Sequence, residues 1–280
     1  MTSLKLALRT SLKTCARDDI PKTIVKTYIA RLLFCFVLFF SFVVFSVIVT
    51  PAAHAQNIRW SGLEWKVTRG GMAGVAKGDP ANVTVDAKGY LHLRIAKRDG
   101  QWTSAEVFTV DEMSFGTYQW IVEGDVYRMD PTTVLGLFPY GPVHHKGADA
   151  ENEIDIEFSQ WNKTCHGCDA DFTVYPATGK RRPEGKSAWE DNFYVAGGTL
   201  TTARIEWSRD RIVFTLMNGA HAIGETGDVI KTEVYPTAAT TGAADIPQVS
   251  MPVGINLWCF EKTPEKEQEV VVREFEYAAK

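Results

Sequence analysis

Positive charge is scarce in the body of this chain. The 280 residues carry a formal net charge of -4, and no long basic run occurs after residue 55. A protein whose main partner is nucleic acid would carry a basic patch or stripe, so the composition argues against that class of partner. The sequence also lacks an internal repeat, and residues 56–280 lack a long amphipathic helical pattern.

Cysteine is also sparse in the body of the chain, where only Cys165, Cys168 and Cys259 occur. The Cys165–Cys168 pair does not match a haem attachment motif, because Asp169 follows it in place of histidine. Two cysteines with one nearby histidine make a poor zinc site. No βαβ pattern surrounds the pair, which argues against a thioredoxin-like role. We expect one disulfide in an oxidising compartment, with its pairing left open.

The first 55 residues have the pattern of a targeting segment. Basic residues occur throughout the first 31 residues, an uncharged apolar run covers residues 32–49, and Ala53-His54-Ala55 precedes Gln56. This pattern predicts a cleaved secretory signal with a long basic region. The alternative is an uncleaved anchor, because the apolar run approaches the length that spans a membrane. In both cases the body is expected on the far side of the membrane, secreted or periplasmic.

Residues 56–280 form a single domain's worth of sequence, and strand-like segments follow one another throughout it. The expected strands cover residues 90–96, 102–110, 116–124, 133–140, 153–158, 171–175, 202–208, 211–216, 249–260 and 270–277. Short strands separated by turn signals at this spacing predict an all-β sandwich or jelly roll.

The segment with the strongest chemical signal is residues 153–158 (EIDIEF). Strict alternation puts Glu153, Asp155 and Glu157 on one face of a strand and three apolar side chains on the other. An ordinary solvated strand explains the apolar face. It explains poorly three like charges at adjacent same-face positions, since these repel one another. Neighbouring carboxyls push their pKa values apart, which supplies an acid and a nucleophile at one pH.

The same segment, with its surroundings, resembles the family 16 glycoside hydrolases, which include bacterial lichenases and laminarinases. Further resembling segments follow in the family's order: residues 103–106 (TSAE), 115–118 (FGTY), 137–142 (LFPYGP), 205–207 (IEW) with 211–212 (RI), and 251–258 (MPVGINLW). The resemblance covers most of residues 57–277. It implies a concanavalin A-like jelly-roll β-sandwich of two curved antiparallel sheets, with a cleft on the concave face.

The resemblance also implies hydrolysis of β-linked polysaccharides with retention of configuration. Glu153 would be the nucleophile, Glu157 the acid/base and Asp155 the helper between them. The spacing E-x-D-x-E is like that of the lichenase type. Two glutamates leaning toward each other on a twisted strand can approach the separation of about 5–5.5 Å that retaining enzymes need. This chemistry requires no metal and no cofactor.

A polysaccharide cleft needs exposed aromatic rings on which sugars stack. The candidate substrate-binding residues are Trp258, Tyr140, Trp161, Tyr175, Trp102, Glu106 and Asn256. Most of them match cleft positions of the family, and Trp161 is also on the acidic face by parity. Core packing for the aromatic residues and structural hydrogen bonding for the polar ones are the alternatives.

Three positions depart from the lichenase pattern. Glu151 replaces a typical tryptophan, Phe108 replaces an arginine that contacts sugar hydroxyls, and Thr173 replaces an asparagine. These departures put lichenan itself in doubt as the substrate.

The sequence therefore predicts a secreted, endo-acting, retaining glycoside hydrolase, with β-1,3 or β-1,3-1,4 glucan as the expected substrate. The alternatives are a non-catalytic, lectin-like carbohydrate-binding protein and a transglycosylase that uses the same site. We expect a monomer whose partner is a polysaccharide, with no nucleic acid, and with membrane contact only through an uncleaved leader.

Overall fold

The computed structural model of the chain describes residues 57–70, 72–141, 151–165, 168–175, 189–195, 198–236 and 245–280. The leader predicted over residues 1–55 lies outside these ranges, so its cleavage stays a prediction. Within them, no helix has the length and apolar character needed to cross a membrane.

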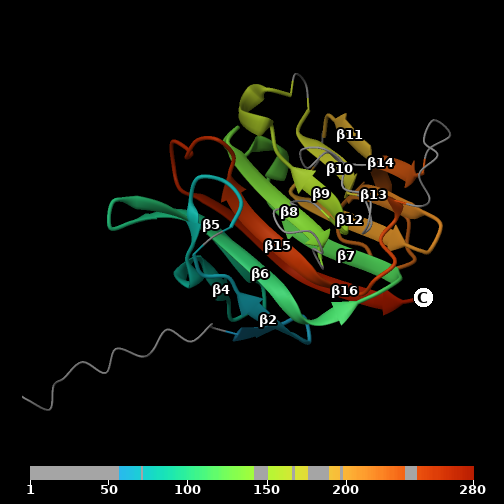
Figure 1. The fold of residues 1–280 in the computed structure, drawn as a ribbon. Coiled ribbons are helices and arrows are strands. Elements are labelled where there is room, and N and C mark those ends of the chain that lie inside the picture. The colour runs from blue at the N-terminus through green and yellow to red at the C-terminus, as the bar shows by residue number, and fades with distance from the viewer. Residues whose placement is uncertain are drawn as a thin grey trace, which may run out of the picture. The chain divides into compact units, whose positions relative to one another are not determined.

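The described residues form strands joined by turns and three short 3-10 helices (Figure 1). The strands are β1 (Asn57–Trp60), β2 (Leu63–Val67), β3 (Lys77–Gly78), β4 (Val83–Val85), β5 (Leu91–Arg98), β6 (Gln101–Met113), β7 (Gly116–Glu123), β8 (Thr133–Pro139), β9 (Glu153–Phe158), β10 (Ala170–Tyr175), β11 (Trp189–Phe193), β12 (Leu200–Trp207), β13 (Ile212–Asn218), β14 (Asp228–Tyr235), β15 (Met251–Cys259) and β16 (Gln268–Ala279). The 3-10 helices are η1 (Pro80–Asn82), η2 (Val126–Arg128) and η3 (Trp161–Lys163).

The strands form two antiparallel layers. The front sheet has the order β11-β10-β9-β8-β15-β6, with the β1–β2 hairpin paired to the far side of β6. The back sheet has the order β5-β16-β7-β12-β13-β14. The β5–β6 hairpin links the two sheets, and short β3 makes a parallel pairing with β6. The predicted all-β, antiparallel jelly-roll sandwich is confirmed.

The core lies between the two sheets and follows the alternation seen in the sequence. Ile154, Ile156 and Phe158 of β9 are all 0% exposed, so the apolar face of the acidic strand is fully buried. Phe172 of β10 stacks on Phe214 of β13 with ring centroids 4.8 Å apart, which joins the two sheets. Because each strand commits one face to this core, its other side chains must point away from it.

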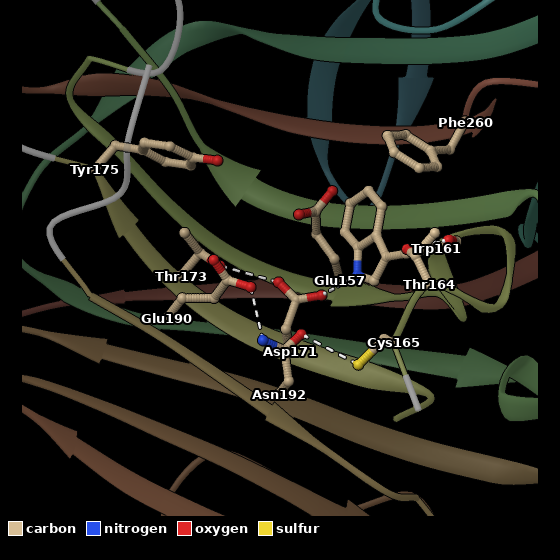
Figure 2. A pocket seen from close by; sticks show the side chains of 10 residues that line it. All are labelled: Glu157, Trp161, Thr164, Cys165, Asp171, Thr173, Tyr175, Glu190, Asn192 and Phe260. Carbon is tan, nitrogen blue, oxygen red and sulfur yellow. Dashed lines mark hydrogen bonds between the residues drawn. The ribbon is translucent and has the colours of Figure 1, made fainter. Parts of the chain in front are cut away.

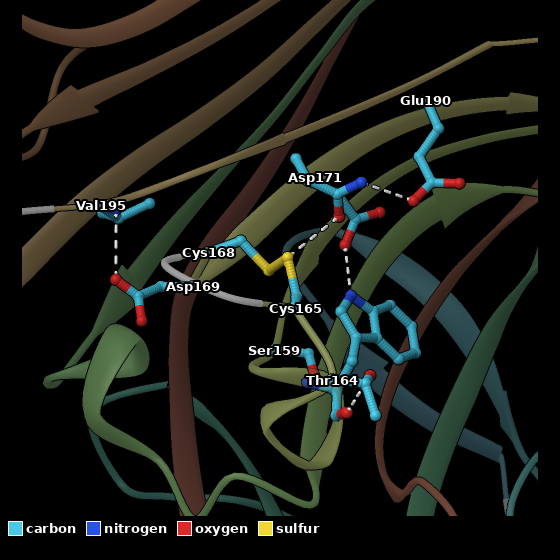
Figure 3. The surroundings of a disulfide bond; sticks show 10 residues. Ser159, Thr164, Cys165, Cys168, Asp169, Asp171, Glu190 and Val195 are labelled. Atoms are coloured by element: carbon cyan, nitrogen blue, oxygen red, sulfur yellow. Dashed lines mark hydrogen bonds between the residues drawn. A yellow bond between two sulfur atoms is a disulfide. The ribbon is translucent and has the colours of Figure 1, made fainter.

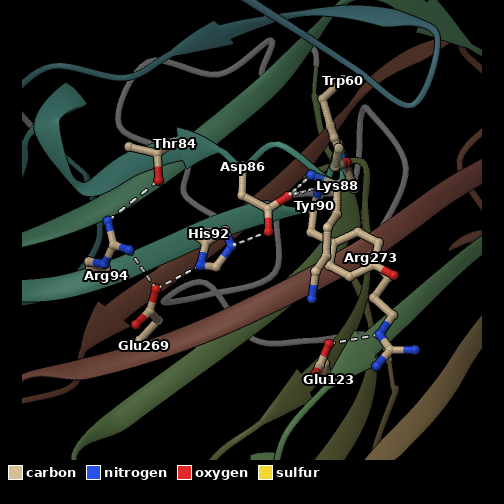
Figure 4. A network of polar contacts seen from close by, with 11 residues as sticks. Trp60, Thr84, Asp86, Lys88, Tyr90, His92, Arg94, Glu123, Glu269 and Arg273 are labelled. Carbon is tan, nitrogen blue, oxygen red and sulfur yellow. Dashed lines mark hydrogen bonds and ion pairs between the residues drawn. The ribbon is translucent and has the colours of Figure 1, made fainter.

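Ionic contacts reinforce the outer surface of the back sheet (Figure 4). His92 Nδ1 on β5 lies 2.7 Å from Glu269 Oε1 on β16, and Arg94 donates to the same oxygen at 2.7 Å. The carboxylate of Asp86 accepts backbone N–H groups from Lys88 and Tyr90, both at 2.9 Å. These pairs are partly exposed, so they contribute modestly to stability and serve mainly to fix the β5–β16 pairing.

Candidate active site

Strand β9 carries the three predicted acids on the face opposite the core. Asp155 is 3% exposed, while Glu153 and Glu157 are half-buried. The observed strand covers the same six residues that the sequence predicts. Strand β10 pairs with β9 along its whole length, and β8 pairs with the other edge at Ile156–Phe158. The alternation of the sequence is therefore the physical reason that the three carboxyls share one face.

Pairing register extends this face into a polar row across the front sheet. The row contains Glu106 on β6, Asn256 on β15, Gly136 on β8, Glu157 on β9, Asp171 on β10 and Asn192 on β11. Asn256 Oδ1 accepts the Gly136 N–H at 3.0 Å, and the Asn256 side chain hydrogen-bonds with the Glu106 carboxyl. A Cβ at Gly136 would lie 2.5 Å from Asn256 Oδ1. The glycine thus leaves space for Asn256 beside Glu157.

A groove of about 420 Å³ lies over β9, β10 and β11 (Figure 2). Tyr175 stands at one side of it, and Trp161 with Phe260 stands at the other. Its lining residues are Glu157, Trp161, Thr164, Cys165, Asp171, Thr173, Tyr175, Glu190, Asn192 and Phe260. Carboxyls therefore occupy the middle of the groove and aromatic rings its flanks. None of these lining residues is a lysine or an arginine.

Crowding of like charges favours protons on this face. Burial, followed by the charges of Glu153, Glu157 and Asp171, raises the pKa of Asp155 well above its usual range. Burial, followed by the charges of Asp171, Glu153 and Glu190, does the same to the pKa of Glu157. The Asp155 carboxyl also hydrogen-bonds with Glu153. A protonated acid and an ionised carboxylate can therefore coexist here near neutral pH.

Asp171 is the most buried acid of the groove, at 1% exposure. Its pKa is raised to about 7, chiefly by burial and to a smaller extent by the charge of Glu190, against hydrogen bonds from Thr173 and Trp161 that lower it. Asp171 was not among the site residues predicted from the sequence. Alternation within residues 171–175 would have placed it on the face of Thr173 and Tyr175, but the register that sets it opposite Glu157 depends on which strands pair.

The sequence also did not identify six other lining residues as site residues: Thr164, Cys165, Thr173, Glu190, Asn192 and Phe260. Glu190 and Asn192 belong to edge strand β11, where Asn192 Nδ2 donates to Glu190 Oε1 at 2.6 Å. Strand β11 was not predicted, so its polar residues had no assigned face. Phe260 directly follows β15 and packs edge-on against Trp161, with ring centroids 5.1 Å apart.

Two predicted sugar-contact residues do line the groove. Trp161, on η3, donates its indole Nε1–H to Asp171 Oδ1 at 3.0 Å, which fixes the plane of the ring. Tyr175 ends β10 directly opposite Glu153. Burial and the surrounding carboxyls raise the pKa of its hydroxyl, so Tyr175 stays protonated and available as a donor.

The other predicted contact residues lie outside the groove lining. Trp258 is 9% exposed, and the backbone of Gly74 lies against its ring. Tyr140 bridges to Glu153 and packs with Phe108 and Phe138, each with ring centroids 6.3 Å away. Trp102 pairs with Lys97 in the β5–β6 hairpin and packs against the core. Glu106 and Asn256 hydrogen-bond with each other. Sugar-binding roles for these five residues stay predictions.

A disulfide joins Cys165 and Cys168 beside the groove (Figure 3). It connects the turn after η3 to the start of β10, and Cys165 Sγ lies 3.8 Å from Asn192 Oδ1. Cys259, on β15, is buried and unpaired. The structure therefore supplies the pairing that the sequence left open, and the bond tethers the segment that carries Trp161.

The described ranges contain no group of three or more histidine, cysteine, aspartate or glutamate side chains arranged to hold a metal ion. The chemistry available to these residues is proton transfer and nucleophilic attack by carboxyls. When two nearby carboxyls have separated pKa values, the protonated one can donate a proton to a leaving group. The ionised one can attack the carbon to which that group is bound.

Neither a family model nor a curated protein matches the sequence, but solved structures match the fold. A β-glucanase of Bacillus licheniformis is 17% identical with a TM-score of 0.57, covering 81% of this chain and 96% of its own. A family 16 endo-glucanase of Bacteroides ovatus is 10% identical with a TM-score of 0.55, covering 76% and 94%. An immunostimulatory antigen and pseudo β-1,3-glucanase of Mycobacterium tuberculosis is 16% identical with a TM-score of 0.56, covering 77% and 91%. The chain therefore has the jelly-roll fold of the glycoside hydrolase family 16 β-glucanases.

Proposed function

We propose that the protein is a secreted, endo-acting, retaining glycoside hydrolase that cleaves β-linked polysaccharides. The observation that carries this proposal is the set of Glu153, Asp155 and Glu157 on one face of β9, with the pKa values of Asp155 and Glu157 raised by burial and by neighbouring acids. A solvated structural strand has no use for such crowding, because each buried like charge costs stability. An acid/base and nucleophile pair requires it.

The proposed mechanism assigns one role to each carboxyl. Glu157 donates its proton to the glycosidic oxygen while the Glu153 carboxylate attacks the anomeric carbon, so the C–O bond to the leaving sugar breaks and a glycosyl ester forms. Glu157, now ionised, takes a proton from water, whose oxygen attacks the anomeric carbon and releases Glu153. Asp155 hydrogen-bonds with Glu153 and holds its orientation.

The groove favours an uncharged glycan. Its lining contains three acids (Glu157, Asp171 and Glu190) and no lysine or arginine, so a sulfated or uronic polysaccharide would meet repulsion there. Aromatic rings at both sides, Trp161 and Tyr175, suit the apolar faces of sugar rings. β-1,3 or mixed-linked β-1,3-1,4 glucan fits these features. A secreted or periplasmic location is proposed on the basis of the predicted leader over residues 1–55.

The test is reducing-sugar release by the purified full chain from laminarin, lichenan, barley β-glucan, xyloglucan, agarose and carrageenan. Glu153→Gln is run beside wild type, and Glu206→Gln, an exposed glutamate on β12, is the matched control. We expect wild type to hydrolyse a neutral β-glucan. Glu153→Gln should lower the rate by at least about 10³-fold, and Glu206→Gln should keep the wild-type rate.

Three outcomes would contradict parts of the proposal. Binding of glucan without turnover by wild type would identify a lectin-like protein. Normal turnover by Glu153→Gln would remove the nucleophile assignment. Products longer than the starting oligosaccharide would instead identify a transglycosylase acting through the same ester.

A further inference from the structure

The carboxylate of Asp171 is held by two donors, one on each oxygen. Trp161 Nε1–H donates to Oδ1 at 3.0 Å, and Thr173 Oγ1–H donates to Oδ2 at 2.9 Å. The residue is 1% exposed, so these bonds are shielded from water. A carboxyl that accepts hydrogen bonds at both oxygens is arranged for its charged form, since a protonated carboxyl would offer a donor to one of them.

Glu157 is the cross-strand partner of Asp171 and faces the same groove, but its surroundings differ. No described residue donates a hydrogen bond to its carboxyl, and the influences on it are burial and the charges of Asp171, Glu153 and Glu190. Directly opposed side chains on antiparallel strands lie about 5 Å apart at Cβ, close enough for strong coupling. Of this pair, Asp171 is therefore arranged to carry the charge and Glu157 to carry the proton.

We propose that Asp171 is a positioning residue that keeps the proton on Glu157, with the Trp161 indole fixing the Asp171 carboxylate in the orientation that does so. This inference rests on the proposed function, in which Glu157 is the general acid. It adds a fourth carboxyl to the site, one that lies opposite the proposed acid/base Glu157 and not opposite the proposed nucleophile Glu153. It also gives Trp161 two tasks, since the ring that borders the groove is also the donor that stabilises the Asp171 anion.

The other charged groups around Glu157 have the same sign. Glu153 and Asp155 are on its own strand, Asp171 is on β10 and Glu190 is on β11. The β8 sequence on the other edge, residues 133–139, has no ionisable side chain. All of these acids favour a protonated Glu157, but only Asp171 is directly opposite it and held by two donors. Removal of the Asp171 charge should therefore weaken proton binding by Glu157, and the other acids should not compensate for it.

Asp171→Asn is the test variant because it removes the charge and keeps the size and an oxygen acceptor for Trp161. Trp161→Phe is the second variant, because it keeps an aromatic ring and removes the N–H donor. Asp169→Asn is the matched control: it lies two residues away, outside the groove lining, and its carboxylate accepts the Val195 N–H at 3.3 Å. Circular dichroism would confirm that each variant is folded.

The first measurement is kcat/KM against pH on the glucan that wild type hydrolyses. Its alkaline limb reports the group that must be protonated in the free enzyme. We expect Asp171→Asn to move that limb to lower pH by about one unit or more, an effect typical of a close like charge. Trp161→Phe should move it in the same direction by less, and Asp169→Asn should leave it in place. An unmoved limb in Asp171→Asn would overturn the proposal.

The second measurement requires no turnover. Full chain with ¹³C-labelled glutamate carboxyls is titrated by NMR, with Glu157→Gln identifying the Glu157 resonance. We expect the Glu157 midpoint to fall by about one unit or more in Asp171→Asn. If the Glu157 midpoint falls but the protein hydrolyses no glycan, the proposed function is refuted and the effect of Asp171 on Glu157 still holds. If the midpoint is unchanged and the enzyme is active, the effect of Asp171 on Glu157 is refuted and the proposed function still holds.

Discussion

Asp171 lies directly opposite Glu157 across the β9–β10 pairing, and both carboxyls line one groove with Glu190. The described lining holds no basic side chain that could neutralise them. Protons are then the means by which the site reduces its charge, so the folded state binds protons more tightly than the unfolded chain does. Four consequences of this arrangement and of its surroundings can be measured.

Glu157→Gln should stabilise the fold more at pH 8 than at pH 4. The pKa of Glu157 is raised in the folded state by burial and then by Asp171, Glu153 and Glu190. Above the unfolded value of about 4.3, the unfolded chain has lost this proton while the folded chain retains it, so stability declines as pH rises toward the folded pKa. The variant removes that decline. We expect its advantage over wild type in free energy of unfolding to grow by more than about 1 kcal/mol between the two pH values.

Urea denaturation at pH 4 and pH 8 would measure this difference. The exposed Glu206→Gln serves as the control and should show the same difference from wild type at both pH values. A Glu157→Gln variant that loses stability as pH rises, relative to wild type, would mean that the folded protein prefers the ionised glutamate.

Asp155→Asn should lower the rate far more than the stability. Asp155 is 3% exposed and hydrogen-bonds with Glu153, so the proposed nucleophile depends on it for orientation. The amide keeps the shape of the side chain, so packing is preserved. It also removes one of the crowded acids, which reduces repulsion among the others. We expect kcat to fall by about 10²-fold or more, with the free energy of unfolding within about 1 kcal/mol of wild type. Steady-state kinetics beside urea denaturation would measure both, and a wild-type kcat would remove the helper role.

Replacing both Cys165 and Cys168 by serine should disturb the groove more than the fold. The disulfide closes a loop with a sequence separation of only 3, so it restricts the unfolded chain little. Chain-entropy arguments put its contribution near 2 kcal/mol. The bond holds the turn that follows Trp161, so we expect KM for glucan to rise severalfold.

Comparison of the double variant with wild type, each with and without reductant, would test this prediction. Reductant should reproduce the KM of the variant in wild type and leave the variant unchanged. A loss of more than about 4 kcal/mol in the free energy of unfolding would mean that the bond supports the fold rather than the groove wall.

Alternation in the sequence predicted the fold and the bounds of strand β9 well. Strand β9 has the predicted bounds, Glu153–Phe158. Within it each Ile or Phe on the core face is preceded by an acid, which must point away from the core. Hydrophobic periodicity is a local property, so one strand suffices to reveal it.

Edge strands and cross-strand partners were harder to predict. Strand β14 is an edge strand with mostly exposed or half-buried residues, and β11 is a short edge strand, so neither has a clear apolar face. Asp171 lay within a predicted strand, yet its position opposite Glu157 depends on register between strands that the sequence does not specify. Trp258 matched a cleft position of the family, but the loop that carries Gly74 covers its ring.

Gly136→Ala should lower both stability and activity, because it displaces a neighbour in the polar row that crosses the front sheet. Gly136 pairs with Glu157 on one side and Asn256 on the other, and a Cβ there would lie 2.5 Å from Asn256 Oδ1. Asn256 would have to move, losing its bond from the Gly136 N–H and disturbing its bond with Glu106. We expect a loss of about 1–3 kcal/mol in the free energy of unfolding and a lower kcat/KM.

Gly198→Ala is the matched control, because no atom lies within 4 Å of a Cβ built there. Thermal denaturation and glucan hydrolysis of both variants would separate a local steric effect from a general intolerance of alanine. If Asn256 serves only Gly136 and Glu106, the double variant Gly136→Ala with Asn256→Ala should recover much of the lost stability, because the clash is removed. If Asn256 also contacts the sugar, as its family position implies, stability should recover while kcat/KM stays low. Full recovery of both quantities would exclude Asn256 from substrate binding.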